Sequence, residues 1–244
     1  LRTSSAASDV YKRQYESRAI ALLNHKYGEG AVIAKVFTEK YGLKSFSIKR
    51  NKSKKSKNKI LLLDKMSLLT INAKNNSKKE IQYLSEINLA YAYQNTSLKN
   101  KLIRLFISEV LSKALIDSEK NITLFQFIWN TNTQIDKLEN VDNNFCIIFL
   151  IQLSEFLGIS PSIENNELPY FNLNTANFTN IKNKNEEIIE GEMLDYFKRL
   201  IIKEKVSIAY HKRQELIKIL FRYYSIHHIN LLNIKSYDVI ESLA

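Results

Sequence analysis

The chain is poor in the residues on which disulfide-bonded, thiolate-metal and turn-rich folds depend. Its 244 residues include one cysteine, Cys146, together with five glycines and two prolines. A single cysteine excludes an intrachain disulfide and a thiolate-rich zinc site, and its place within FCIIFL predicts a buried, small apolar side chain. Scarce Gly and Pro beside abundant Leu, Ile, Lys, Asn and Glu favour a largely helical body with few tight turns.

Long hydrophobic runs are missing as well. The longest, Phe145 to Ile151, is too short to span a bilayer, and the sequence contains no signal-peptide hydrophobic region. We therefore expect a cytoplasmic protein. With 45% hydrophobic and 11% aromatic residues, the chain is still able to bury a real core.

The sequence also lacks the residue arrangements that catalysis requires. It has no phosphate-binding Gly-rich loop with Lys and Ser or Thr, no dinucleotide fingerprint and no nucleophile elbow. His227 and His228 are adjacent, so on a helix they point about 100° apart and cannot hold one metal together. The glutamates between residues 186 and 192 are typical of a helix start. We expect no enzyme activity, no metal and no cofactor.

Positive charge is concentrated in one place. Between Lys44 and Lys59 the chain carries eight basic residues and no acidic one, whereas the whole sequence has 36 basic and 25 acidic residues. The remainder is therefore nearly neutral. A focused positive field attracts phosphate and releases counterions on binding, so nucleic acid is the leading partner. A solvated loop that only keeps its charge out of the core is the alternative.

Residues 1–14, LRTSSAASDVYKRQ, show neither strand nor helix periodicity and resemble an adapter-like, non-native leader. Without them, and outside Lys44 to Lys59, the chain has 25 basic and 24 acidic residues. We expect an OB-fold nucleic-acid-binding domain at residues 15–93. A helical domain should follow at residues 94–244, with an irregular insert at about 159–188.

The predicted barrel rests on short apolar runs with turn signals between them. Gly42 should adopt the left-handed conformation of a hairpin turn, because a Cβ there would clash. Ile81, Tyr83, Ile87 and Leu89 are expected to share the apolar face of the last strand. Five strands in so short a stretch suit a small closed barrel, for which the OB-fold is the economical choice. The expected strands are Arg18 to Leu23, Ala31 to Phe37, Leu43 to Lys49, Ile60 to Ile71 and Glu80 to Leu89.

A period of about 3.6 replaces the period of two after residue 93, which predicts helices and an overall α+β fold. The third helix is apolar nearly all round, so it should be central to its bundle, and Gly158 with Pro161 should end it. Tyr170 to Leu173 and Asn177 to Phe178 suggest a short hairpin. The expected helices are 102–111, Leu124 to Leu138, Phe145 to Leu157, Glu190 to Lys203, Ala209 to His227 and Ile234 to Leu243.

Strands 2 and 3 of an OB-fold and their adjoining loops commonly bind nucleic acid, and the Lys-rich segment leaves strand 3. Tyr27 and Tyr41 are candidate base-stacking residues, whereas Phe46 is expected to face the core. Contacts from Lys and Arg to phosphate carry no sequence information, so binding should be non-specific. The candidate DNA-binding residues are Lys35 on strand 2, Lys44 and Lys49 on strand 3, and Arg50, Lys52, Lys54, Lys55 and Lys57 in the loop.

Ordered motifs over residues 15–244 resemble the RecO family of bacterial DNA repair and recombination mediators. They include AIALLNHKYGEGAVIAKVFTEKYGLKSFSIK in the barrel, then EINLAY, FLIQLSEFLGISP and YFNLNTANF. Many RecO proteins carry a cysteine-rich zinc module after the segment equivalent to Leu157 and Gly158. This chain has neither Cys nor His between Ile159 and Leu168, so it is similar to the zinc-less, bacteroidete-like variant. Arg50 stands where the family often has Gly.

The resemblance implies that the protein binds single- and double-stranded DNA, anneals complementary strands without ATP, and acts with RecR and in many bacteria RecF. Together they load RecA on DNA coated by single-stranded DNA-binding protein (SSB), which implies a nucleoid-associated protein. The helical domain of the family receives the acidic, hydrophobic C-terminal tail of SSB, so exposed helix cations are candidates for that contact. These are Lys101, Arg104, Lys198 and Arg199.

Three other functions remain open at this point. A generic OB-fold DNA- or RNA-binding protein with a helical interaction domain would bind structured RNA and fail to anneal strands. A metal-dependent nuclease would need clustered acidic residues in the barrel, which has few. A purely structural scaffold would keep its partners after deletion of Arg50 to Lys59.

Overall fold

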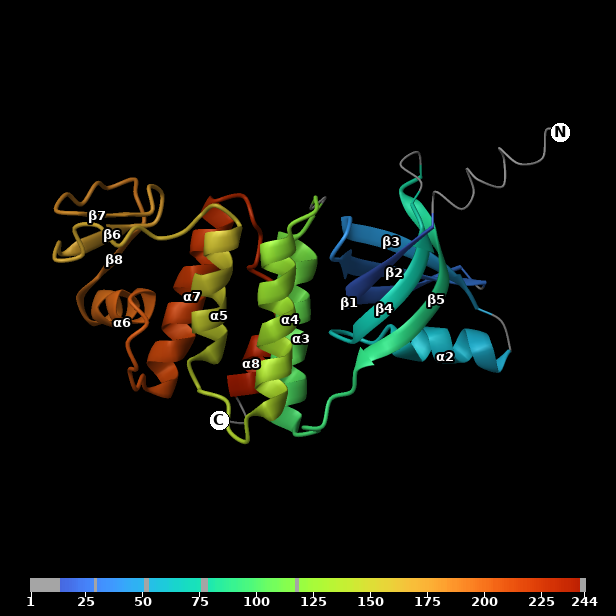
Figure 1. Cartoon of the computed structure of the whole chain (residues 1–244). Helices are drawn as coiled ribbons and strands as arrows, with labels where there is room; N and C mark the ends of the chain where they lie inside the picture. Colours follow the sequence, from blue (N-terminus) through green and yellow to red (C-terminus); the bar gives the residue numbers. More distant parts are fainter. Residues whose placement is uncertain (1–13, 29, 51–52, 76–78, 117–118, 242–244) are drawn as a thin grey trace. The chain divides into compact units, whose positions relative to one another are not determined.

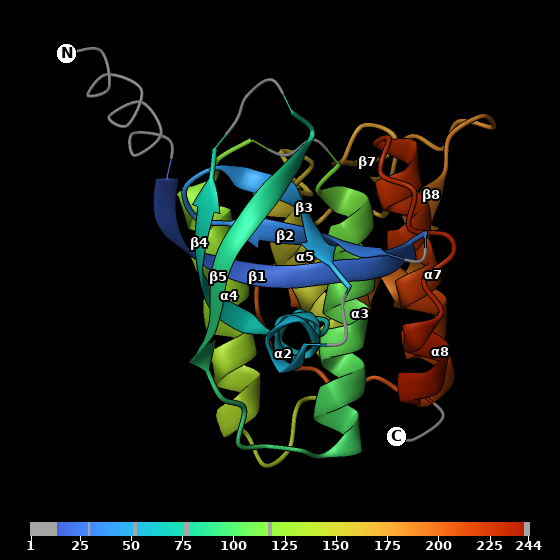
Figure 2. The same ribbon diagram turned by 90° about the vertical axis from the view of Figure 1, so that its right-hand side faces the viewer.

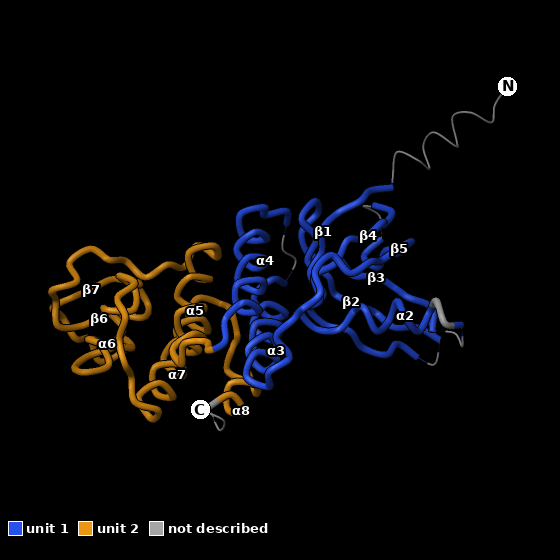
Figure 3. Tube along the Cα trace, turned by 60° about the horizontal axis from the view of Figure 1, so that its bottom comes forward, with its two compact units in different colours: residues 1–139 blue, residues 140–244 orange. Residues whose placement is uncertain are grey.

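The computed structural model describes residues 14–28, 30–50, 53–75, 79–116 and 119–241. Two compact units divide the chain, residues 1–139 and 140–244 (Figure 3). The elements of the first are β1 (Gln14–Tyr27), β2 (Ala31–Thr38), β3 (Gly42–Lys49), α2 (Lys54–Leu62), β4 (Leu68–Lys74), β5 (Ile81–Tyr91), α3 (Leu98–Ala114) and α4 (Ile122–Lys137).

The five strands of the first unit form a closed barrel in the order β1-β2-β3-β5-β4 (Figures 1 and 2). All neighbours are antiparallel except β3 and β5, which pair in parallel through Ser45 with Ile81 and Ser47 with Tyr83. This order is that of an OB-fold, so the predicted barrel is confirmed. Gly42 has φ +67° at the β2–β3 turn, as its position in the hairpin predicts.

Strand β1 closes the barrel because it pairs along both of its edges. Its first half lies beside β4, from Gln14 opposite Lys74, and its second half lies beside β2, to Tyr27 opposite Ala31. A register shift between Ala21 and Leu23 bends it, which is how barrels turn corners. The strand is longer than Arg18 to Leu23, and Gln14, expected in the leader, is its first residue; residues 1–13 lie outside the described part of the chain.

The expected strand from Ile60 to Ile71 is wrong in its first part. Residues 54–62 form α2, and β4 begins only at Leu68. Lysine is a good helix former, and Ser53 caps the helix by accepting a hydrogen bond from the Ser56 N–H at 3.3 Å. Ile60 and Leu62 then pack against the buried core of the barrel. The strongly basic sequence obscured these helix signals.

The expected face of the last strand is also wrong. Gln82 and Leu84 are buried, whereas Ile81 is 41% and Tyr83 60% exposed. Asn72 pairs with Glu86 but Ala73 pairs with Leu84, so Ser85 is an extra residue in β5. Each such bulge exchanges the two faces of a strand. Ile87 therefore points inward after the bulge, as expected, and Tyr83 before it points outward.

Helices α3 and α4 pack on the outside of the barrel within the first unit. The Ser108 hydroxyl donates to the Leu22 carbonyl at 2.5 Å, and Phe125 of α4 lies 5.8 Å from Phe37 of β2, ring centre to ring centre. Arg18 of β1 lies over Trp129 at 5.0 Å. The expected domain boundary at residue 93 stays a prediction; in the structure, α3 and α4 complete the hydrophobic packing of the barrel's unit.

The second unit contains the expected hairpin, β6 (Tyr170–Asn172) with β7 (Asn177–Thr179), and a third strand, β8 (Ile188–Glu190), that the sequence pattern did not predict. Leu216, Leu220 and Tyr224 of α7 are buried as predicted, and the Tyr224 hydroxyl donates to the Leu150 carbonyl of α5 at 2.6 Å. Gly158 has φ +72° just after α5. The elements are α5 (Phe145–Phe156), β6 (Tyr170–Asn172), β7 (Asn177–Thr179), β8 (Ile188–Glu190), α6 (Gly191–Ile201), α7 (Tyr210–Ile226) and α8 (Ser236–Glu241).

Candidate nucleic-acid interface

Helix α2 carries the Lys-rich segment and fixes it against the barrel. The Ser56 hydroxyl donates to the carbonyl of Lys49 on β3 at 2.6 Å. The Lys59 ammonium donates to the carbonyl of Ser85 in the β5 bulge at 2.5 Å. With the apolar C-terminal turn in the core, these two bonds hold the basic N-terminal turn at the rim of the barrel between β3 and β5.

The charge at the start of α2 is unfavourable to the isolated helix. The first turn contains no acidic residue, and Lys54, Lys55 and Lys57 follow the cap. A helix N-terminus has a partial positive charge, so lysines there repel it and an anion relieves the repulsion. Backbone N–H groups at this end also suit phosphate oxygens. The arrangement is therefore one that a phosphate would stabilise.

The strand lysines are not all on one surface. Lys49 pairs with Ala31 and Lys44 with Val36, near opposite ends of β3. Five residues of strand separate their Cα atoms by about 17 Å, and an odd spacing places them on opposite faces. Lys35 pairs with Ser45 and is half-buried. Of these three, only Lys49 lies beside the start of α2.

The expected loop residues divide between a short connection and the helix. The Arg50 N–H donates to the Gly30 carbonyl at 2.8 Å, which continues the β2–β3 pairing by one more bond. Lys57 is exposed on α2. Lys52 and the side chains of Lys54 and Lys55 lie outside the described residues.

The two aromatic candidates differ in their surroundings. Tyr27 is 64% exposed at the end of β1. Tyr41 packs edge-on against Tyr15, with ring centres 4.5 Å apart, so part of its ring is already covered. Burial raises the pKa of Tyr15 beneath it. Phe46 is fully buried, as predicted.

Sequence reasoning missed Tyr83, which we assigned to the core. Its ring is on the outer side of β5, opposite Ser47 of β3, and lines a hollow with Lys49 and Lys59. No sequence signal indicated this, because Gln82, which is polar, is the residue that the strand buries before the bulge. A bulge of one residue leaves no clear pattern, so the face cannot be read from alternation alone.

Arg104, a candidate contact for the SSB tail, is buried rather than exposed. Its Nη2 lies 2.8 Å from Oδ1 of Asp136, and its guanidinium lies 3.6 Å above the centre of the Tyr93 ring. Asp136 also accepts the backbone N–H groups of Gln94 and Asn95. The arginine therefore ties the segment after β5 to α3 and α4. Lys101, one turn earlier, is exposed.

The other two candidates for the tail, Lys198 and Arg199, lie at the end of α6 in the second unit. The Lys198 ammonium donates to the Leu168 carbonyl at 2.9 Å, and Arg199 pairs with Glu204 at 3.0 Å. Both cations thus have partners within their own unit.

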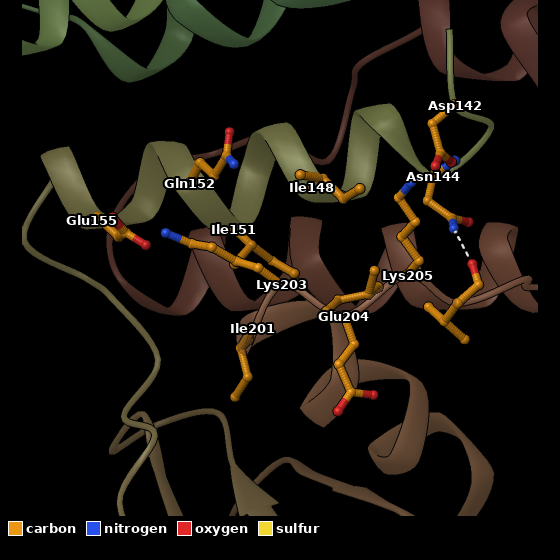
Figure 4. Close-up of a pocket in the computed structure, with 12 residues that line it drawn as sticks. Asp142, Asn144, Ile148, Ile151, Gln152, Glu155, Ile201, Lys203, Glu204 and Lys205 are labelled. Atoms are coloured by element: carbon orange, nitrogen blue, oxygen red, sulfur yellow. Dashed lines mark hydrogen bonds between the residues drawn. The ribbon is translucent and has the colours of Figure 1, made fainter.

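A separate hollow of about 240 Å³ lies between α5 and the segment after α6 (Figure 4). The Asn144 side chain donates to the Val206 carbonyl at 2.7 Å at one end. Lys203 points toward Glu155 along the other (Figure 4). Asp142, Glu155 and Glu204 outnumber Lys203 and Lys205 in its lining, so this hollow does not favour an anion.

Within the described part of the chain, no group of three His, Cys, Asp or Glu side chains is placed to hold a metal ion. No helix among the described residues is long and apolar enough to cross a bilayer. Cys146 is buried, and His227 bonds through Nε2 to the Leu173 carbonyl at 3.0 Å.

A closed barrel of OB-type strand order, with a lysine-rich helix at its rim and a helical region after it, defines the class: an α+β protein built on an OB barrel. The family models give the particular family. Residues 13–93 match the N-terminal part of recombination protein O, and residues 95–237 match its C-terminal part. The chain belongs to the RecO family.

Curated relatives agree along nearly the whole length. The chain is 31% identical over 241 residues to the DNA repair protein RecO of Flavobacterium psychrophilum, which covers 94% of this chain and 99% of the relative. Identity to the RecO of Flavobacterium johnsoniae is 29% over 236 residues, which cover 94% of this chain and 99% of the relative. Identity to the RecO of Bacteroides fragilis is 23% over 227 residues, which cover 89% of this chain and 94% of the relative.

Proposed function

We propose that this protein acts in DNA repair and homologous recombination by binding single- and double-stranded DNA non-specifically and annealing complementary strands without ATP. It then helps to load RecA on DNA coated by SSB. The observation that carries the proposal is the lysine-rich first turn of α2, anchored at the rim of an OB barrel by the Ser56 and Lys59 hydrogen bonds. Membership of the RecO family supports it.

The physical basis of annealing is neutralisation of the phosphate charges of the two strands. Two complementary strands repel each other through their phosphates, and lysines that contact both lower that repulsion while the bases pair. Contacts to phosphate are the same for every sequence, which a general annealing protein requires. No bond is made or broken by the protein, so we propose that it is not an enzyme.

Lys49, Arg50, Lys52, Lys54, Lys55 and Lys57 form the centre of the proposed DNA site. Lys35 and Lys44, which the register separates from that centre, are proposed as peripheral contacts. Tyr27 is the better exposed of the two proposed stacking residues.

Protein partners form the second half of the proposal. RecR, with RecF where it is present, is proposed to act with this chain, and the SSB tail to contact its helices. Lys101 is exposed, whereas Arg104, Lys198 and Arg199 already have partners, so Lys101 is the first of the four cations to test. Charge reversal at Lys101 should weaken tail binding, and an unchanged affinity would remove the assignment.

The decisive experiment measures annealing of complementary strands coated with SSB. Wild type should anneal them, and the variant with Lys52, Lys54, Lys55 and Lys57 changed to Glu should not. Annealing by the variant at the wild-type rate would contradict the role of α2. Failure of wild type would contradict the function itself. The matched control changes four exposed lysines elsewhere to Glu: Lys137, Lys205, Lys218 and Lys235.

A further inference from the structure

The hollow beside Tyr83 is formed by three elements of the first unit. Its volume is about 320 Å³, and its described lining comes from β3, the start of α2 and β5. The lining residues are Ser47, Ile48, Lys49, Ser53, Ser56, Lys59, Tyr83, Leu84 and Ser85. Sites for small ligands start at about 300 Å³, so the hollow is of a size for one small group rather than for an extended chain.

The walls of this hollow are held in place. The hydrogen bond from Ser56 to the Lys49 carbonyl fixes α2 to β3, and the bond from Lys59 to the Ser85 carbonyl fixes it to β5. Ile48 and Leu84 of the lining also belong to the buried core of the barrel. The hollow is therefore preformed.

The chemistry of the lining is cationic, hydroxylic and aromatic. Lys49 and Lys59 supply two ammonium groups, and none of the described lining residues is acidic. Serine hydroxyls are present on all three walls. Among the apolar side chains of the lining, that of Tyr83 is the most exposed, at 60%. A tyrosine so exposed on a strand is not accounted for by packing.

We propose that this hollow binds one nucleotide of a single DNA strand, with the base on the Tyr83 ring and the phosphate near Lys49 and Lys59. The inference rests on the proposed DNA binding and adds a subsite to it. A nucleotide combines a planar ring with an anion, which matches one aromatic ring beside two cations. The two aliphatic residues of the lining, Ile48 and Leu84, are buried, so a peptide with aliphatic side chains would find little aliphatic surface here.

Preference for single strands follows from this geometry. In a duplex each base is stacked between its neighbours and its face is not available to a protein side chain. In a single strand the base can turn out and stack on tyrosine, which is worth about 5- to 150-fold in affinity for each base. The α2 lysines, by contrast, contact phosphates of either form.

The test compares Tyr83→Val with wild type on a single strand and on a duplex of equal length. Valine keeps the strand propensity and removes the ring. Affinity for single strands should fall about 5- to 150-fold, affinity for duplex should stay within twofold, and the salt dependence should be unchanged, since stacking releases no counterions. Tyr83→Phe should bind like wild type. Tyr210→Val, at an exposed tyrosine in the second unit, is the matched control.

A second variant tests the phosphate position. Lys59→Gln should reduce the log–log salt slope on single strands by about 0.7, whereas Lys218→Gln, on the exposed side of α7, should leave it unchanged. An unchanged slope for Lys59→Gln would overturn this part of the proposal.

Three other results would overturn the subsite. One is Tyr83→Val binding single strands within twofold of wild type. Another is a loss of affinity for duplex equal to the loss of affinity for single strands. The third concerns an Asp- and Phe-rich peptide. If this peptide binds wild type but not Tyr83→Val, and single strands bind both proteins with equal affinity, the hollow belongs to a protein partner. If wild type binds neither form of DNA, the proposed function itself fails.

Discussion

Arg104 and Asp136 form a buried ion pair, 2.8 Å from Nη2 to Oδ1, that joins α3 to α4 directly beneath the segment leaving the barrel. Burial of Asp136 by itself would raise the pKa of its carboxyl. Hydrogen bonds from the Gln94 and Asn95 backbones, from Tyr91 and from Arg104 outweigh that effect and lower its pKa below the ordinary value. The folded barrel unit thus depends on a carboxylate that stays charged.

Asp136→Ala should destabilise the first unit by about 3–5 kcal/mol, because it leaves the Arg104 guanidinium buried without its partner. Urea unfolding followed by the fluorescence of Trp129, the only tryptophan in the chain, measures this loss. Arg104→Met combined with Asp136→Ala should cost less than the sum of the single changes. Asp195→Ala, an exposed aspartate on α6, is the control. Additive effects would contradict the pairing.

The stability of the same unit should depend on acid pH. Because the pKa of Asp136 is lower in the folded than in the unfolded protein, its contribution is present above the unfolded pKa of about 3.9 and is lost as the pH falls through the folded value. Unfolding midpoints measured from pH 7 downward should therefore fall more steeply in wild type than in Asp136→Ala. Parallel curves would mean that another carboxylate dominates.

Substitutions of the α2 cap should separate stability from DNA binding. Ser53→Ala removes the cap bond to Ser56 and should cost about 1 kcal/mol. Ser53→Asp retains the cap and places a negative charge beside the helix N-terminus, so it should stabilise the protein by about 0.3–1 kcal/mol. The same charge repels phosphate, so DNA affinity should fall. Urea unfolding and fluorescence anisotropy with labelled DNA measure the two effects, and an aspartate variant that binds more tightly would refute the site.

The salt dependence of the DNA affinity should give the number of phosphate contacts. About five lysine and arginine contacts predict a log–log slope near −3.5 on single strands. The variant with four α2-segment lysines changed to Glu should show a much shallower slope. Titrations at several salt concentrations test this, and a wild-type slope near zero would exclude the lysine-rich surface as the DNA site.

The β2–β3 turn gives a test of the fold. Gly42 has φ +67°, so Gly42→Ala should cost about 1–2 kcal/mol from backbone strain alone. Gly30 lies outside the left-handed region, and a Cβ there would meet nothing within 4 Å. Gly30→Ala should therefore be neutral or slightly stabilising. Thermal unfolding of the two variants should differ in sign or clearly in size.

Local patterns were sufficient for much of the fold. Alternation gave β2 and β3, the left-handed turn required Gly42, and the 3.6-residue period gave the α7 stripe of Leu216, Leu220 and Tyr224. Helix α2 was missed although Ser53 and a run of good helix formers were present, because a dense run of charge also suits a solvated loop. The sequence predicted lysines after the third strand of the barrel but did not predict that a helix carries them.

The sequence by itself determined where along the chain the charge is, because the charge of each residue follows from its type. It also determined where most strands and helices lie, because the period of the hydrophobic residues is a local property. The tertiary structure decided which side chains meet. One inserted residue, Ser85, turned Tyr83 outward and Gln82 inward, and only pairing with β4 reveals it. Arg104 and Asp136, separated by 32 positions, became partners because α3 and α4 pack together. Such effects depend on register and packing between distant segments, which no local pattern contains.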